Sequence, residues 1–373
     1  MTSRIILIIN KDREIDVVAK MPETYWMNGG DSNYSYVLNS TMQRDGSVTV
    51  KRMIEKVILD RLDVTHLLSN SNTFYVADLG CSVGPNCFIS MQNVIEAVKR
   101  KYQMSKTEAY KVPEFQVFFN DTSFNDFNTL FTSLPSQKQY FAAGVPGSFH
   151  GRLFPESSLH FIHSAYALHW LSEIPKEVVD SNSAAWNKGR IHYAGANEQV
   201  GKAYSAQFAK DFEVFLNARA KELVVGGMMT LLVFGIADGI SLSAFPAGFQ
   251  FSFLGSSLMD MAKEGLVSED MVDSFNLPLY TPCPREIGEL VERNGSFSIE
   301  RIEITPFGWT ELSAHSCVLH LRAAFEGLSS KHFGSEVVDE WFARSNEKGR
   351  ELSSQIESAL KEATQIFIAL IRK

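Results

Sequence analysis

Strand-like and helix-like patterns of apolar residues alternate through the first two thirds of the chain. An apolar run over 74–79 leads through a glycine-bearing loop into a segment with apolar residues every three or four positions, which predicts a strand, a loop and a helix. A long amphipathic segment later in the chain predicts a helix that ends at Gly226-Gly227. Further strands are predicted at 115–119, 140–143, 159–162 and 228–234. Strands that alternate with helices form a mostly parallel sheet covered on both faces, so we expect the α/β class.

The pattern changes after about residue 235. Most of the remaining sequence has helical periodicity, but two late apolar runs, 296–302 and 366–371, read as strands that could complete the sheet. We therefore predict one α/β core, an N-terminal arm and a helical cap. The arm is 1–26; the core is 27–235 with 296–304 and 361–373; the cap is 236–295 and 305–360.

The composition narrows the functional classes. Hydrophobic residues make up 45% of the 373 residues, which excludes a wholly disordered chain. A net charge of −8 lacks the basic footprint of a protein that binds nucleic acid or anionic membranes. The four cysteines form no CxxC pair, so neither a zinc ribbon nor a disulfide framework is indicated, and a reducing, cytoplasmic location is expected. No apolar run is long enough to span a membrane.

Candidate ligand-binding residues follow the first two predicted strands. Gly80 and Gly84 stand in the loop after the first strand, where glycines allow a tight turn and a close approach to a ligand. Their spacing does not match the G-x-G-x-x-G of a dinucleotide site. Asp121 ends the second strand, where it could bond ribose hydroxyls. S-adenosylmethionine, a nucleoside without a pyrophosphate, fits these features, although a plain β–α turn and a capping acid would leave the same pattern.

A second candidate set follows the strand at 159–162. Tyr166, His169 and Trp170 share one face if this segment is helical, and they would suit a small anionic or aromatic molecule. An aromatic core stripe is the alternative. Four phenylalanines in the predicted cap could likewise form the wall of an apolar pocket or ordinary core packing; they are Phe245, Phe249, Phe251 and Phe253.

Motifs along nearly the whole chain after Met27 resemble one known family. The motifs are Met27-Asn28-Gly29-Gly30, Ala77-Asp78-Leu79-Gly80-Cys81, Gly84-Pro85-Asn86, Phe119-Asn120-Asp121, Gly144-Val145-Pro146-Gly147-Ser148-Phe149, Arg152-Leu153-Phe154-Pro155, His163-Ser164-Ala165-Tyr166, Asn187-Lys188-Gly189 and Asp273-Ser274-Phe275-Asn276-Leu277-Pro278. Together they resemble the plant SABATH methyltransferases. Those enzymes use S-adenosylmethionine to methylate carboxyl groups of small acids or ring nitrogens of xanthines.

The resemblance implies a Rossmann-like class I methyltransferase core with an α-helical cap, and a role for each matching position. It places at the cofactor Tyr36, Ser40, Asp78, Cys81, Asn86, Asp121, Thr122, Ser148 and Phe149. It places at the acceptor Gln43, Tyr166, His169 and Trp170. It also implies a homodimer and the Mg²⁺ site described in some members, formed here by Asn187, Asp273, Phe275 and Asn276, whose oxygens are hard ligands that suit this ion.

Carboxyl O-methylation of a small apolar or aromatic acid is the leading functional hypothesis. A carboxylate is already ionised near neutral pH, so the enzyme needs no strong base, and Gln43 and Trp170 are the expected catalytic donors to the acceptor oxygen. One departure weakens this reading, because several carboxyl methyltransferases of the family have Lys where this chain has Asn28. N-methylation of a xanthine-like heterocycle is the alternative within enzymes, and a non-catalytic small-molecule binder is the alternative outside them.

Overall fold

A single seven-stranded sheet forms the centre of the computed structural model, which describes residues 25–69, 71–105, 112–240, 246–309 and 313–373. The strand order is β3-β2-β1-β4-β5-β7-β6. The strands are β1 (Thr73–Leu79), β2 (Glu114–Asp121), β3 (Phe141–Pro146), β4 (Leu159–Ala165), β5 (Leu223–Phe234), β6 (Phe297–Pro306) and β7 (Thr364–Arg372). The helices are α1 (Tyr36–Asn39), α2 (Thr41–Arg61), α3 (Val64–Leu67), α4 (Pro85–Met104), α5 (Phe127–Thr132), α6 (Glu198–Glu222), α7 (Pro246–Lys263), α8 (Glu269–Asp273), α9 (Pro284–Asn294), α10 (Ala314–Phe333), α11 (Ser335–Glu351) and α12 (Ser353–Lys361).

The mostly parallel sheet predicted from the sequence is confirmed. The first five strands run parallel, and β7 is antiparallel to both of its neighbours, β5 and β6. The late strands thus extend one edge of the sheet. Because the parallel strands share a direction, their carboxyl ends all open toward the same edge, where open α/β sheets bind ligands.

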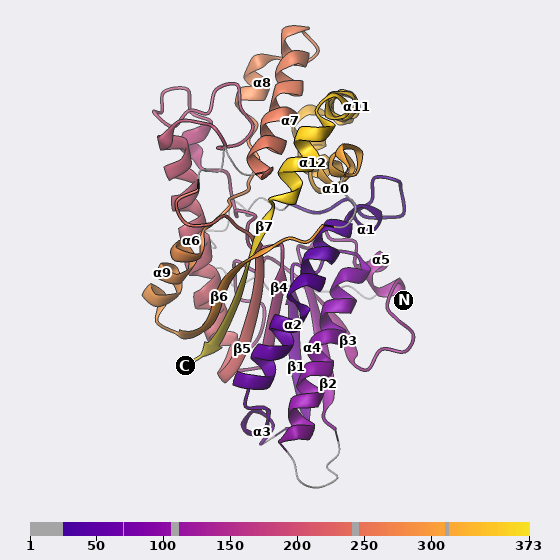
Figure 1. Cartoon of the computed structure of the whole chain (residues 1–373), viewed down its shortest axis with the longest axis vertical. Coiled ribbons are helices and arrows are strands. Elements are labelled where there is room, and N and C mark those ends of the chain that lie inside the picture. The colour runs from indigo at the N-terminus through magenta and orange to yellow at the C-terminus, as the bar shows by residue number, and fades with distance from the viewer. Residues whose placement is uncertain (1–24, 70, 106–111, 241–245, 310–312) are drawn as a thin grey trace, which may run out of the picture.

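Helices cover both faces of the sheet, and the cap lies beyond its ligand-binding edge (Figure 1). One apolar cluster packs α2 and α4 against one face, and a second packs α6 against the other. The cap helices α7, α10, α11 and α12 gather around the fully buried Trp341, whose indole N–H donates to Leu254 O over 2.9 Å. No helix within the described residues is apolar and long enough to cross a bilayer.

Two details of the predicted organisation are wrong. The predicted cap included α9, but this helix packs against α6 and β6, and its apolar residues join the core cluster on that face. The predicted helix stop at Gly226-Gly227 is also wrong, because α6 ends at Glu222 and the chain continues directly into β5. The two glycines occupy an irregular stretch of β5, where the pairing with β4 shifts register and a Cβ on Gly227 would lie 3.1 Å from His160 O.

A buried ion pair joins the end of α6 to the loop after β3. Arg219 and Glu222 have fully buried side chains, and Arg219 Nε lies 2.7 Å from Glu222 Oε2. The Arg219 guanidinium also donates to Phe149 O over 2.7 Å and to Gly151 O over 2.8 Å. Glu222 Oε1 accepts the N–H groups of Leu153 and Phe154. Among the described residues, every side-chain hydrogen bond of the pair that reaches outside α6 ends on the 149–154 segment.

Loss of this pair should destabilise the fold strongly. Arg219→Met would leave Glu222 as an unpaired buried carboxylate, so we expect the free energy of unfolding to fall by about 3–5 kcal/mol. Arg285→Met is the matched control, because Arg285 and Glu289 form an exposed pair in α9 with side chains that are 70% and 64% accessible. The control should lose at most about 0.5 kcal/mol. Urea denaturation measures the free energy of unfolding of both variants. Equal losses in the two would contradict a stabilising role for the buried Arg219–Glu222 pair.

Candidate active site

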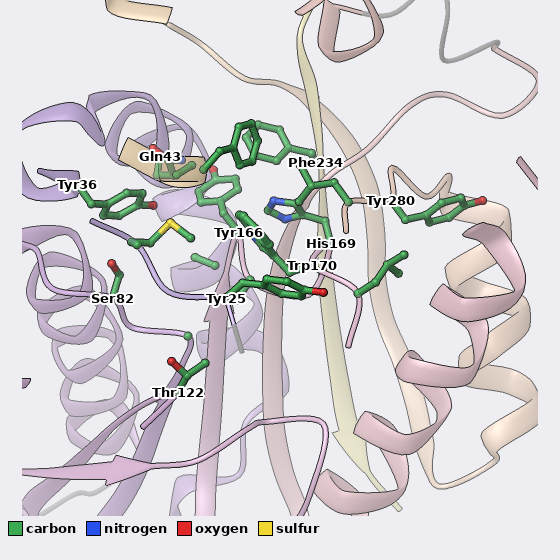
Figure 2. A pocket seen from close by; sticks show the side chains of 18 of the residues that line it. Tyr25, Tyr36, Gln43, Ser82, Thr122, Tyr166, His169, Trp170, Phe234 and Tyr280 are labelled. Carbon is green, nitrogen blue, oxygen red and sulfur yellow. The ribbon is translucent and has the colours of Figure 1, made fainter. Parts of the chain in front are cut away.

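A large cavity opens at the carboxyl ends of the parallel strands. It has an empty volume of about 1310 Å³ and is lined at the end of β1, β2, β4 and β5 by Gly80, Asp121, Ala165 and Phe234. A smaller cavity of about 420 Å³ adjoins it. Tyr36, Gln43, Gly80, Ser82, Ala165 and Tyr166 line both cavities. Figure 2 shows Tyr36, Ser82 and Thr122 on one side of the large cavity, His169, Trp170 and Phe234 on the other, and Tyr166 between them.

Of the two glycines in the loop after β1, only Gly80 has a conformation and a neighbour that require glycine. Gly80 has φ +77°, and a Cβ there would lie 2.3 Å from the Ala167 Cβ, so a larger residue would meet both strain and a clash. Gly84 instead has an extended φ of −117° and is the N-cap of α4. Asn86 lies within the first turn of α4, and its Nδ2 donates over 3.0 Å to both the carbonyl and the hydroxyl oxygen of Ser40. This contact ties the loop to the start of α2.

Asp121 is held in place by backbone donors. Its two carboxylate oxygens accept the N–H of Ser82 over 2.8 Å and that of Thr122 over 2.7 Å. Burial raises the pKa of Asp121 to about 6, although these two bonds act in the opposite direction. The side chain still lines the large cavity, and each carboxylate oxygen keeps a free lone pair, so Asp121 can accept further hydrogen bonds from a ligand.

Asp78 is a buried acid without a hydrogen-bond donor among the described residues. It is 3% exposed and lines the smaller cavity. Burial, and secondarily the charge of Asp121, raise its pKa well above the ordinary value. A carboxylate in this position is costly until a cation arrives, so the smaller cavity suits a ligand with a positively charged group.

The residues predicted at the cofactor divide between the two cavities. The large cavity is lined by Tyr36, Asp121, Thr122, Ser148 and Phe149, and the small one by Tyr36, Asp78, Cys81 and Asn86. Ser40 lines neither cavity and instead accepts from the Asn86 amide. The Arg219–Glu222 pair reaches this region directly, since Arg219 holds the carbonyl oxygen of Phe149.

All four residues predicted at the acceptor line the large cavity, but three of them are not on a helix. The segment 166–170 is a turn in which Tyr166 has φ +56° and Trp170 forms an isolated bridge to Leu279. The condition under which Tyr166, His169 and Trp170 would share a helical face is therefore not met. The Tyr166 N–H donates to Leu232 O over 2.8 Å, so pairing with β5 extends one residue past β4 before the chain turns.

The polar groups at the acceptor end are neutral. Burial, with His320 nearby, lowers the pKa of His169 to about 3, so its imidazole is uncharged near pH 7. The Tyr166 hydroxyl donates to Gln365 of β7 and is thereby committed to the fold. The Trp170 ring lies 5.8 Å from the rings of both Tyr25 and Phe325, and its indole N–H has no partner among the described residues. Trp170 thus offers a free donor in an aromatic wall.

No lysine or arginine lines this cavity within the described part of the chain. Asn28 is not among the lining residues either. Its side-chain amide donates to Glu326 of α10, and its N–H donates to Ala323 O over 3.0 Å. An anionic acceptor in this cavity would therefore depend on neutral hydrogen-bond donors.

Several lining residues were not predicted from the sequence. Of the four phenylalanines in question, Phe251 lines the cavity, Phe253 and Phe249 pack in the cap cluster, and Phe245 lies outside the described residues. The cap also contributes Gln250, His320 and Phe325. These residues stand in ordinary helical patterns with no local motif, and only the docking of α7 and α10 brings them to the site.

The residues predicted at a metal gather away from both cavities. Asn187 Nδ2 donates to Asn276 Oδ1 over 2.6 Å, and Asp273 Oδ1 accepts the Gly189 N–H over 2.7 Å. Asn187 Oδ1 is buried without a partner. No group of three or more His, Cys, Asp or Glu side chains with metal-binding geometry occurs in the described ranges. The cluster therefore offers one carboxylate and amide oxygens, a hard donor set.

Comparison with known proteins identifies the family. Residues 22–373 match the family model for SAM-dependent carboxyl methyltransferases. Loganic acid O-methyltransferase of Catharanthus roseus is 41% identical over 96% of this chain and 97% of its own length. Farnesoic acid carboxyl-O-methyltransferase of Arabidopsis thaliana is 38% identical over 94% of this chain and 100% of its own length. Paraxanthine methyltransferase 2 of the same plant is 38% identical over 92% of this chain and 97% of its own length.

A solved structure agrees with these relatives. The structure of loganic acid methyltransferase with SAH superimposes with a TM-score of 0.88 at 41% identity, covering 93% of this chain and 98% of the other. The family model and this match confirm the α/β class, the Rossmann-like methyltransferase core and the cofactor that the sequence predicted. The chain belongs to the S-adenosylmethionine-dependent carboxyl methyltransferases, the SABATH family, and is an enzyme of that type.

Proposed function

We propose that this enzyme transfers a methyl group to the carboxylate of a small, largely apolar acid and forms its methyl ester. The observation that carries the proposal is the pairing of neutral donors, Gln43 and Trp170, with aromatic walls from Tyr25, Phe251 and Phe325 in one cavity. Donors suit a carboxylate oxygen, and the aromatic rings suit an apolar body. Gln43 also lines the adjoining small cavity, so the acceptor and cofactor would meet beside it.

We assign the cofactor to the residues at the strand ends. Asp78, buried and without a donor, would hold the ammonium group of the methionine portion. Asp121 would accept from the ribose hydroxyls, and Ser148 and Phe149 would flank the adenine. S-adenosylmethionine supplies an electrophilic methyl group on a positively charged sulfur. The chain's own contribution is to hold the ligands in place and exclude water.

Orientation supplies most of the catalysis in this scheme. A carboxylate is ionised near pH 7, so no residue has to remove a proton from it. Gln43 and Trp170 would hold the acceptor oxygen in line with the methyl group, and alignment of this kind contributes up to about 7–11 kcal/mol. His169 is neutral and a weak base, and this scheme does not require it to remove a proton from the acceptor. It would serve as a polar part of the cavity wall.

An acceptor screen tests the proposal. The wild-type enzyme is incubated with radiolabelled methyl donor and with panels of aliphatic acids, aromatic acids and xanthines. Methyl esters are labile in base and N-methyl products are not, so a base-labile product from an acid supports the proposal. Base-stable label from a xanthine would overturn it. If calorimetry shows that the cofactor binds but no compound of any panel is methylated, the result would instead support a non-catalytic small-molecule binder.

N-methylation of a heterocycle remains the second candidate because of the missing cation. No lysine or arginine lines the described part of the cavity, and the neutral His169 could bond a heterocyclic nitrogen or carbonyl. The 38% identity to paraxanthine methyltransferase 2 is consistent with such a change of acceptor on this fold. The xanthine arm of the screen decides between the two candidates.

We further propose a structural Mg²⁺ held by Asn187, Asp273, Asn276 and the Phe275 carbonyl. The unpartnered Asn187 Oδ1 and the Asp273 carboxylate fit an oxygen-seeking cation, and none of the four residues lines the acceptor cavity. Chelation should therefore lower the melting temperature of the wild type and leave the melting temperature of Asp273→Asn unchanged.

A homodimer is proposed on the family resemblance alone, and a strictly monomeric species in sedimentation at micromolar concentration would contradict it.

Cofactor affinity should depend on pH through Asp121. Its pKa is about 6 in the free protein, and the protonated acid loses acceptor capacity toward the ribose, so affinity should fall below pH 6 by up to about tenfold per pH unit. Asp121→Ala should weaken binding by about 2–4 kcal/mol at pH 7.5. Calorimetric titration with the cofactor from pH 5 to 7.5 measures both effects. In Asp121→Asn, the cofactor affinity should keep only the part of its pH dependence that comes from Asp78. A pH-independent wild-type affinity would refute the assignment.

Trp170→Phe should reduce activity without weakening cofactor binding. The ring wall is mostly kept and the indole donor is lost, so kcat/KM should fall about 10- to 100-fold, the value of a hydrogen bond to a charged oxygen. Trp341→Phe is the matched control: it loses an indole donor in the cap core, so it should lower the melting temperature with little change in kcat/KM. If Trp170→Phe behaves like this control, Trp170 is a packing residue.

A further inference from the structure

One imidazole connects the cap to the acceptor end of the cavity. His320 of α10 lines the large cavity, and its Nδ1 lies 2.9 Å from the carbonyl oxygen of Asn39, the last residue of α1. Its Nε2 lies 3.3 Å from Nε2 of Gln43 in α2. A chain of polar contacts thus runs from the end of α1 through the cap helix to Gln43.

The partners of this imidazole determine its tautomer. A carbonyl oxygen can only accept, so His320 Nδ1 must carry the hydrogen. Burial lowers the pKa of His320, so the ring is neutral and its Nε2 presents a lone pair. The group that faces this lone pair has to be a donor, which is the NH₂ of Gln43 rather than its carbonyl oxygen.

The same contact fixes which way round the Gln43 amide sits. One N–H of the amide is bonded to His320, and the second stays available on the same nitrogen. The carbonyl oxygen, Oε1, is buried and has no hydrogen-bond partner. If the amide turned over, Oε1 would face the Nε2 lone pair and the two would repel. The unpartnered oxygen is a cost of this orientation, and the repulsion from the His320 lone pair opposes the alternative.

We propose that His320 is a positioning residue, which uses its Nε2 lone pair to keep the Gln43 NH₂ available as a donor to the acceptor oxygen. The proposal rests on the proposed function only in assigning that oxygen to the acceptor. His320 also docks α10 on α1 through Asn39, and this contact alone would be a structural role. The two roles use different nitrogens of one ring, so they can be separated.

Three substitutions at one position separate the two roles. Asn places an amide near the Nδ1 position and keeps the bond to Asn39, whereas Gln places a carbonyl oxygen near the Nε2 position and keeps an acceptor for Gln43. Leu keeps neither. We expect His320→Gln within about threefold of wild-type kcat/KM, and His320→Asn and His320→Leu about 10- to 50-fold lower, with cofactor affinity changed by less than about twofold in all three.

A double-mutant cycle tests whether His320 acts through Gln43. In a Gln43→Ala background, His320→Leu should lower kcat/KM by no more than about twofold further, because the group that it positions is gone. Full activity in His320→Asn, or additive losses in the cycle, would overturn the proposal and leave His320 a docking residue. Melting temperatures of all variants identify any loss that comes from unfolding.

A spectroscopic measurement keeps this inference separate from the acceptor assignment. Long-range ¹H–¹⁵N correlation on the wild type, with His320 assigned by loss of its signals in His320→Gln, should show a neutral ring protonated at Nδ1. The side-chain NH₂ signal of Gln43, assigned with Gln43→Ala, should shift in His320→Leu. An Nε2-protonated ring would overturn this inference even if acids are methylated. A Nδ1-protonated ring with no acid methylated would overturn only the proposed function.

Discussion

The rest of the site depends on the hydrogen bonds and close contacts made by the turn after β4. Tyr166 takes a left-handed conformation there, and its hydroxyl donates to Gln365, whose amide in turn donates to Gly46 O of α2 over 3.1 Å. A Cβ on Gly46 would lie 2.1 Å from that hydroxyl, so α2 can approach only because residue 46 is glycine. Ala167 fills the equivalent space above Gly80. One turn thereby sets the relative positions of the loop after β1, α2 and β7.

The fold places two acids at adjacent strand ends and leaves them partly unsatisfied. Parallel strands end at one edge, so Asp78 of β1 and Asp121 of β2 come close enough for the charge of Asp121 to raise the pKa of Asp78. Backbone donors offset part of the cost at Asp121, and nothing among the described residues does so at Asp78. In the proposed binding mode, the positive charge and the hydroxyl groups of S-adenosylmethionine would offset both costs.

The acceptor end is built from segments that are distant in the sequence. Tyr25 precedes the first helix, Trp170 follows β4, and His320 and Phe325 come from α10 of the cap. No lysine or arginine lines the cavity within the described residues, and burial lowers the pKa of both His169 and His320. The proposed acceptor would therefore be held by neutral hydrogen-bond donors and aromatic rings. Asn28 lies outside this cavity, and its side-chain amide is bonded to Glu326 of the cap helix α10.

The sequence by itself determined the strands, the parallel sheet and the family, because buried parallel strands are continuous apolar runs and the motifs are local. It also indicated Asp121, since a strand end is visible in the pattern. Only tertiary structure decided that Tyr166 begins a turn rather than a helix, that α9 covers the sheet, and that Gly226-Gly227 lie within β5. His320 had no local signal at all. Its role depends on the direction of two hydrogen bonds to residues about 280 positions away, and periodicity cannot encode such a contact.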